Sequence, residues 1–162
     1  MLNFFYIIIN RGYKLVFGNN YMLHAPLFLK VDDTLFDAQC HFSAHCLSFL
    51  PSLRGKRILD IGCGNGMLAR YILKTYDPSF IYGVDIVAHQ IDIAKINIEK
   101  DQEGRILFAV DDAQLLSTVG NQQFDIVICI ESALHYPDKN RFLSQVKRVL
   151  APGRIFSYSG SP

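Results

Sequence analysis

The stretch Ile58–Gly66, ILDIGCGNG, decides the fold of this chain. It is an apolar run that contains one carboxylate, Asp60, and that continues into three glycines at alternate positions, Gly62, Gly64 and Gly66. Such a run is typical of a buried strand that ends in a tight turn before a helix. Glycines let a bound molecule approach the backbone closely at the start of that helix. We therefore predict a ligand site at the end of this strand.

Strands and helices alternate along the rest of the chain. The expected strands span residues 57–61, 80–86, 105–110, 124–130 and 152–159, and the expected helices span residues 32–50, 66–76, 88–100 and 138–150. Strands that are apolar throughout indicate a mostly parallel sheet buried on both faces. Right-handed crossovers then give an α/β, Rossmann-like, doubly wound sheet in three layers, with ligand sites at the carboxyl ends of its strands.

Composition restricts the partners that we expect. The 162 residues carry a net charge of +1 and no block of Lys or Arg, so nucleic acid is not expected. The apolar N-terminal run is too short to span a membrane and lacks the features of a signal peptide. The four cysteines show no zinc-like spacing, which favours reduced thiols in a cytoplasmic protein.

Asp60 discriminates between two kinds of ligand. A dinucleotide places a pyrophosphate at the start of the helix, where a neighbouring carboxylate would repel it. A ligand with an ammonium group and no phosphate would be attracted instead. The alternative is a purely structural Asp60 that caps the turn.

The stretch DIGCGNG resembles motif I, D/E-x-G-x-G-x-G, of the class I S-adenosylmethionine-dependent methyltransferases. Four later stretches resemble the same family in the same order: YGVDI (82–86), VDDAQLL (110–116), FDIVICIESALHY (124–136) and RFLSQVKRVLAPGRI (141–155). The likeness covers residues 58–156 and implies a methyltransferase that uses S-adenosylmethionine.

The resemblance also implies individual roles. Asp85 would hold both ribose hydroxyls, since a carboxylate accepts two hydrogen bonds at once. Ile86 would pack on the adenine, Asp112 would accept from its amino group, and Ala113 would supply a backbone contact. The predicted cofactor-binding residues are Asp60, Gly62, Cys63, Gly64, Asn65, Gly66, Asp85, Ile86, Gln90, Asp112, Ala113, Ile130 and Glu131. No metal site is expected.

The loop after the fourth expected strand bears on the methyl acceptor. Enzymes that methylate amino groups of bases often carry N/D-P-P-Y there, whereas residues 131–136 read ESALHY. This loop and YKLVFGNNYMLHA (13–25) resemble the small-molecule, sterol-like and natural-product branch. His135 is the predicted catalytic base, because imidazole takes a proton near neutral pH. The expected acceptor is a small molecule, methylated at oxygen or carbon.

Two features depart from the family pattern. Arg154 replaces the second glycine of the family's P-G-G turn, so backbone strain is expected there. The chain also ends before the family's last strands and so resembles a member shortened at its C-terminus. Residues 154–159 would then form an exposed edge strand, which predicts self-association through this edge or its cover by residues 4–9.

We expect residues 1–50 to form a helical cover or lid and residues 51–162 to form the cofactor-binding domain, together one compact unit. Two other functions stay open. A shortened chain could bind the cofactor with weak catalysis and act through a partner. An NAD-dependent oxidoreductase would also use Asp85 on a ribose, although Asp60 argues against it.

Overall fold

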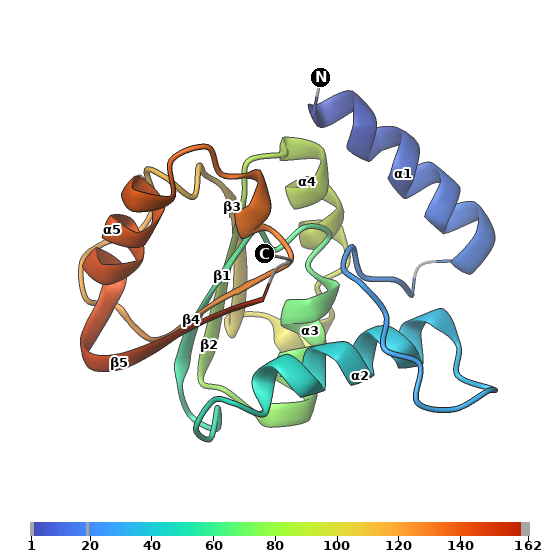
Figure 1. The fold of residues 1–162 in the computed structure, drawn as a ribbon, viewed down its shortest axis with the longest axis horizontal. Helices are drawn as coiled ribbons and strands as arrows, with labels where there is room; N and C mark the ends of the chain where they lie inside the picture. The colour runs from blue at the N-terminus through green and yellow to red at the C-terminus, as the bar shows by residue number, and fades with distance from the viewer. Residues whose placement is uncertain (1, 19, 160–162) are drawn as a thin grey trace.

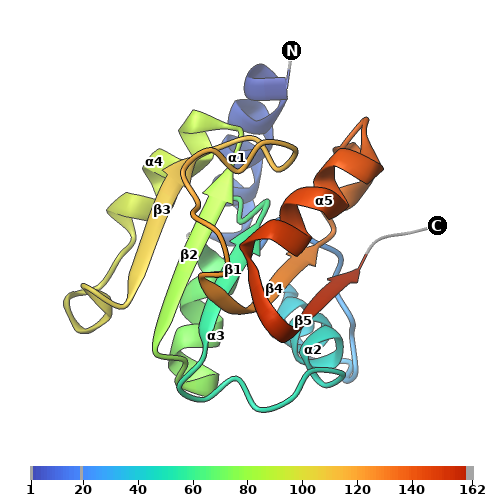
Figure 2. The same cartoon turned by 90° about the vertical axis from the view of Figure 1, so that its left-hand side faces the viewer.

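Five parallel strands form one sheet, in the order β3-β2-β1-β4-β5, in the computed structural model, which describes residues 2–18 and 20–159. Figure 2 shows the strands side by side. Their order reverses at β1, which places the topological switch point, where such sheets bind ligands, between β1 and β4. The strands are β1 (Arg57–Ile61), β2 (Phe80–Asp85), β3 (Ile106–Val110), β4 (Phe124–Ile130) and β5 (Leu150–Ser159).

Helices cover both faces of this sheet, as the continuous apolar strands predict (Figure 1). Neighbouring residues of β1 belong to different cores: Ile58 packs beneath α2, α3 and α4, whereas Leu59 packs beneath α5. The α/β, three-layered fold is therefore confirmed. The helices are α1 (Leu2–Phe17), α2 (Leu35–Leu47), α3 (Met67–Tyr76), α4 (Ala88–Ile96) and α5 (Lys139–Val149), with short 3₁₀ turns at Lys100–Gln102 and Ala133–His135.

The element boundaries follow local capping and turn chemistry. β1 and β4 have the predicted bounds. α2 begins after Thr34, whose hydroxyl accepts from the amide of Asp37 while the Asp37 carboxylate accepts from the amide of Thr34. α4 ends at Ile96, four residues before the predicted end, and a 3₁₀ turn follows.

Residues 4–9 do not cover β5, so that expectation is wrong. Residues 4–9 belong to α1, which packs against α4 on the other side of the molecule (Figure 1). Its inward face carries Tyr6, Asn10 and Tyr13, spaced at i, i+4 and i+7. Within the described part of the chain, none of the helices combines the length and the apolar character that crossing a membrane requires.

The irregular part of β5, where its pairing with β4 shifts register between Leu150 and Ile155, is not strained at Arg154, which also corrects an expectation. The residue with a positive φ, of 72°, is Gly153, which adopts this conformation freely. Arg154 instead forms an ion pair with Asp125, with 3.1 Å between Nε and Oδ1.

Candidate active site

The glycine loop between β1 and α3 lies at the carboxyl end of the sheet. Gly62, Gly64 and Gly66 have φ angles of 76°, 53° and 75°, a region that other residues rarely adopt. A Cβ on Gly62 would lie 2.3 Å from the Cβ of Ser132, and one on Gly66 would lie 2.6 Å from the ring of Phe108. The protein's own packing therefore requires these two glycines, in addition to any approach of a ligand.

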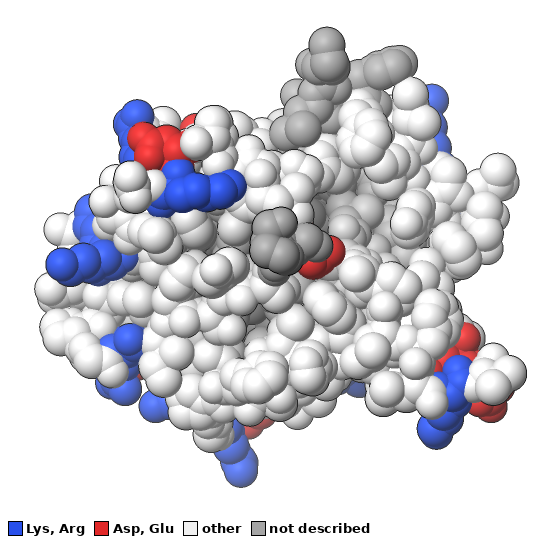
Figure 3. Space-filling view, in the orientation of Figure 1, with Lys and Arg blue, Asp and Glu red and all other residues white. Residues whose placement is uncertain are grey.

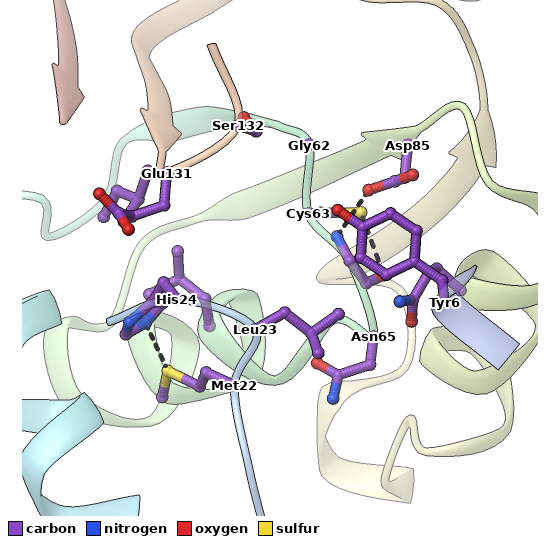
Figure 4. Close-up of a pocket in the computed structure, with 14 residues that line it drawn as sticks. Tyr6, Met22, Leu23, His24, Gly62, Cys63, Asn65, Asp85, Glu131 and Ser132 are labelled. Carbon is purple, nitrogen blue, oxygen red and sulfur yellow. Dashed lines mark hydrogen bonds between the residues drawn. The ribbon is translucent and has the colours of Figure 1, made fainter. Parts of the chain in front are cut away.

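Two cavities meet over this loop and share Tyr6, Gly62, Asp85 and Ser132. The narrow cavity, of about 60 Å³, is shown in Figure 4. Its predicted residues are Gly62, Cys63, Gly64, Asn65, Asp85, Gln90, Ile130 and Glu131. The wide cavity, of about 230 Å³, is lined by the predicted residues Gly62, Asp85, Ile86, Asp112, Ala113 and His135.

The structure thus brings together twelve of the fourteen predicted residues, counted from these two linings. The other two are Asp60 and Gly66, which line neither cavity. Gly66 is the N-cap of α3, and Asp60 is buried beneath the glycine loop. On the face shown in Figure 3, the charged side chains lie mostly at the margin, and the surface is hollowed beside α1.

Asp85 is held in position by two backbone amides. Its Oδ2 accepts from the amide of Gly64 at 3.0 Å and its Oδ1 from the amide of Val87 at 2.8 Å. Each oxygen retains acceptor capacity, so the carboxylate can still take two donors from a bound molecule. Burial raises the pKa of Asp85, and the two amides oppose that shift. In Figure 4 its side chain lies beside the ring of Tyr6.

Asp60 is a buried carboxyl with an unsatisfied oxygen. Within the described residues, its Oδ2 has no hydrogen-bond partner. Burial, and secondarily the charge of Asp85, raise the pKa of Asp60 to about 7. A cation bound nearby would favour the ionised form of this side chain.

The surroundings of Gln90 show whether the narrow cavity suits S-adenosylmethionine. Its side chain is 1% exposed, and neither its Nε2 nor its Oε1 has a partner in the described part of the chain. A buried amide of this kind points to polar groups supplied by a bound molecule. The amino-acid arm of S-adenosylmethionine carries both an ammonium and a carboxylate, so the residues fit this group.

The wide cavity fits the remainder of the cofactor. Ile86 and Ala113 are apolar, while Asp112 supplies a carboxylate at the same cavity. A flat apolar base with one amino group requires this combination of surfaces. Asp85 lies where the two cavities meet, between the sites expected for the base and for the amino-acid arm.

The loop after β4 is joined to β1 by a hydrogen bond from Ser132. The Ser132 hydroxyl donates to the carbonyl of Ile61 at 2.8 Å and accepts from the Tyr136 hydroxyl at 2.9 Å. Burial raises the pKa of Tyr136 far above its ordinary value. Glu131 has a φ of 56°, a strained conformation of the kind that clusters at functional sites. His135 follows in a 3₁₀ turn and is exposed at the wide cavity.

The N-terminal segment contributes lining residues that were not predicted. Tyr6, Leu23 and His24 all line the narrow cavity (Figure 4). Nε2 of His24 lies 2.9 Å from the hydroxyl of Ser43, and burial lowers the pKa of this histidine. His24 is the histidine of the stretch YKLVFGNNYMLHA, which resembles the small-molecule branch, so the sequence could have indicated it. No sequence pattern indicated Tyr6.

Comparisons with known proteins agree with this geometry. A family model described as "Methyltransferase domain" matches residues 52–161. A ubiquinone biosynthesis O-methyltransferase of Coxiella burnetii is 35% identical over 108 residues, which is 67% of this chain and 44% of that protein. A probable phthiotriol/phenolphthiotriol dimycocerosates methyltransferase 2 of Mycobacterium ulcerans is 30% identical over 161 residues, which is 96% of this chain and 61% of that protein.

A solved methyltransferase structure is also similar to this chain. Phosphoethanolamine N-methyltransferase 2 of Haemonchus contortus, in complex with S-adenosyl-L-methionine, is 26% identical with a TM-score of 0.73. The match covers 91% of this chain and 31% of that one. This chain spans about half the length of the curated relatives it matches, 44% and 61% of the two described.

Proposed function

This chain belongs to the class I S-adenosylmethionine-dependent methyltransferases, and we propose that it methylates a small lipophilic acceptor at oxygen or carbon. The observation that carries this proposal is the pair of adjoining cavities, with an oriented Asp85 at their junction and, in one of them, a Gln90 amide that no described residue satisfies. The relatives named for ubiquinone biosynthesis and for phthiotriol/phenolphthiotriol dimycocerosates support a lipophilic acceptor. The first of them is named an O-methyltransferase, which favours oxygen.

In this proposal the protein orients the reactants and excludes water. When bound, S-adenosylmethionine supplies a methyl group on a sulfonium. Asp85 would accept from the two ribose hydroxyls, Asp112 would accept from the adenine amino group, and Gln90 would bind the amino-acid arm. Holding the acceptor in line with the methyl group supplies much of the rate in such a transfer.

The proposed lid is the segment of residues 1–50. The Cδ1 atom of Leu23 lies 3.1 Å from the Cβ position of Gly64, directly over the glycine loop. Tyr6 borders both cavities from α1. Side chains in these positions would exclude water from the bound cofactor.

His135 is the proposed base for a hydroxyl acceptor. Among the described residues, its ring nitrogens engage no hydrogen-bond partner, and it reaches the wide cavity beside Asp85. His24 is less suited to this role, because its Nε2 is already close to Ser43 and its Nδ1 lies 2.9 Å from the carbonyl of Ala25.

Calorimetric titration with S-adenosylmethionine, S-adenosylhomocysteine and NADH tests the cofactor. We expect the first two to bind and NADH to leave the heat signal unchanged; the reverse would favour the oxidoreductase. Product formation over a panel of phenolic and isoprenoid acceptors then tests catalysis. Cofactor binding without any product would favour the weakly catalytic binding domain.

We also propose that two copies associate through β5. β5 pairs with β4, and within residues 2–18 and 20–159 no strand lies on its other side. Ile155 is 41% exposed and Tyr158 is 64% exposed, which favours pairing along this edge. Light scattering should detect a dimer that Ile155→Lys dissociates. A monodisperse wild-type monomer would contradict the proposal.

A further inference from the structure

A second cleft lies between α1 and α4, apart from the cofactor cavities. Figures 1 and 2 show α1 at the outside of the molecule, against α4. The α1–α4 cleft has a volume of about 270 Å³ and shares only Asn65 with the narrow cavity and no residue with the wide one. The residues that matter here are Asn10, Arg11 and Lys14 of α1 and His89 of α4.

The α1–α4 cleft has basic residues and no acidic residue in its lining. Arg11 and Lys14 are one helical turn apart and therefore lie on one side of α1. In the described part of the chain, neither forms an ion pair, and α1 contains no Asp or Glu. The cleft would therefore attract an anion.

Asn10 adds an unused donor to this cleft. Its side chain is 4% exposed, and its Oδ1 accepts from the Tyr21 hydroxyl at 3.1 Å. Its Nδ2 has no partner among the residues that the structure describes. A buried donor without a partner lowers the cost of binding an acceptor group, because the bound group would satisfy it.

The solvent side of α1 is apolar over most of its length. Phe5, Ile8, Leu15 and Val16, which we call the α1 stripe, are 56%, 55%, 88% and 69% exposed. Their spacing of i, i+3, i+10 and i+11 places them on one face. Arg11 lies three residues after Ile8 and therefore borders the stripe, and Lys14 lies one turn after Arg11 on the side of the cleft. An apolar stripe beside cations is the pattern of a helix that lies in the plane of a membrane interface.

We propose that α1 docks on an anionic lipid surface. The α1 stripe would enter the boundary between head groups and acyl chains, while Arg11 and Lys14 contact acidic head groups at the mouth of the cleft. Tyr6 of the same helix lines both cofactor cavities, so docking would bring the methyl-transfer site to the surface that holds lipophilic molecules. The docking itself does not depend on the proposed reaction and can be measured without it.

Vesicle flotation tests this docking. The protein should float with vesicles of equal phosphatidylglycerol and phosphatidylcholine and remain unbound with phosphatidylcholine alone. Arg11→Gln/Lys14→Gln should weaken binding about 30-fold, since each cation near such a surface contributes about 1 kcal/mol and about 1.4 kcal/mol is tenfold. The matched control, Arg141→Gln/Lys147→Gln on α5, removes the same charge and should bind like the wild type. Ile8→Ser/Leu15→Ser should abolish binding with all charges retained.

Three results would overturn the docking proposal. The first is equal weakening by both charge variants, which would indicate non-specific attraction. The second is equal binding to neutral and anionic vesicles. The third is a dimer without vesicles that Leu15→Ser dissociates, which would assign the stripe to a second copy. S-adenosylhomocysteine affinity is the folding control: a variant that keeps this affinity and loses vesicle binding supports the proposal.

Discussion

Asp60→Asn is expected to stabilise the free protein at neutral and higher pH. Burial of this carboxyl raises its pKa from 3.8 to about 7. A carboxyl whose folded pKa lies above its unfolded pKa binds its proton more tightly in the folded state. The free energy of unfolding therefore falls as the pH rises from 3.8 to about 7, and it stays low above that interval.

The size of the effect follows from the same two pKa values. A difference of about 3 pH units, at 1.36 kcal/mol per unit, destabilises the ionised wild type by about 4 kcal/mol. An asparagine avoids the charge, but its buried amide lacks a partner and costs about 1–3 kcal/mol. Asp60→Asn should thus gain about 1–3 kcal/mol above pH 7 and lose a similar amount below pH 4.

Urea unfolding of the wild type and the variant, without cofactor, measures this difference across the pH range. Parallel pH profiles would refute the reasoning, because they would show that Asp60 does not titrate differently in the two states. Calorimetry adds a second test. The affinity of the wild type for S-adenosylhomocysteine should rise between about pH 6 and pH 8 as Asp60 ionises and attracts the ligand's ammonium group, whereas the variant should show a flat profile.

Other substitutions test the rest of the site. Asp85→Ala should weaken S-adenosylmethionine binding more than Asp60→Asn, because it removes two charge-assisted hydrogen bonds of roughly 1.5–3 kcal/mol each; unchanged calorimetric affinity would remove the ribose assignment. His135→Ala should leave cofactor affinity intact and lower turnover of a hydroxyl acceptor by about 10²-fold or more; unaffected turnover with saturating acceptor would exclude it as the base. Gly66→Ala should destabilise the fold by about 1–3 kcal/mol in urea unfolding, and Phe108→Leu should recover part of the loss, because the new Cβ would lie 2.6 Å from that ring; an unchanged midpoint would contradict the packing argument.

The sheet could be predicted because its strands are buried on both faces. β1 and β4 are continuous apolar runs, which is the pattern of parallel strands covered by helices on both faces. Residues 4–9 could not be assigned in the same way, since their β-branched residues favour a strand in isolation. Contacts of the N-terminal helix with α4 override that preference.

Some residues of the cofactor site could be predicted from local motifs, and others could not. Asp85 and Asp112 lie at strand ends, where short motifs fix their positions, and both were predicted. Tyr6 and Leu23 reach the site from a segment distant in sequence, through tertiary packing that no local pattern encodes. The strain expected at Arg154 was misplaced by one residue, because the irregular part of β5 has its left-handed position at Gly153.

Side chains at Gly62 and Gly66 would clash with their surroundings, and this affects which residues can change as such proteins evolve. Selection for folding alone would retain these glycines, because their substitution would drive Ser132 and Phe108 out of place. A descendant that no longer turned over substrate would still display the glycine signature. The glycine signature therefore identifies the fold. Whether activity is retained is better judged from groups that the fold itself does not need, such as the Gln90 amide, whose two polar atoms bond to none of the described residues.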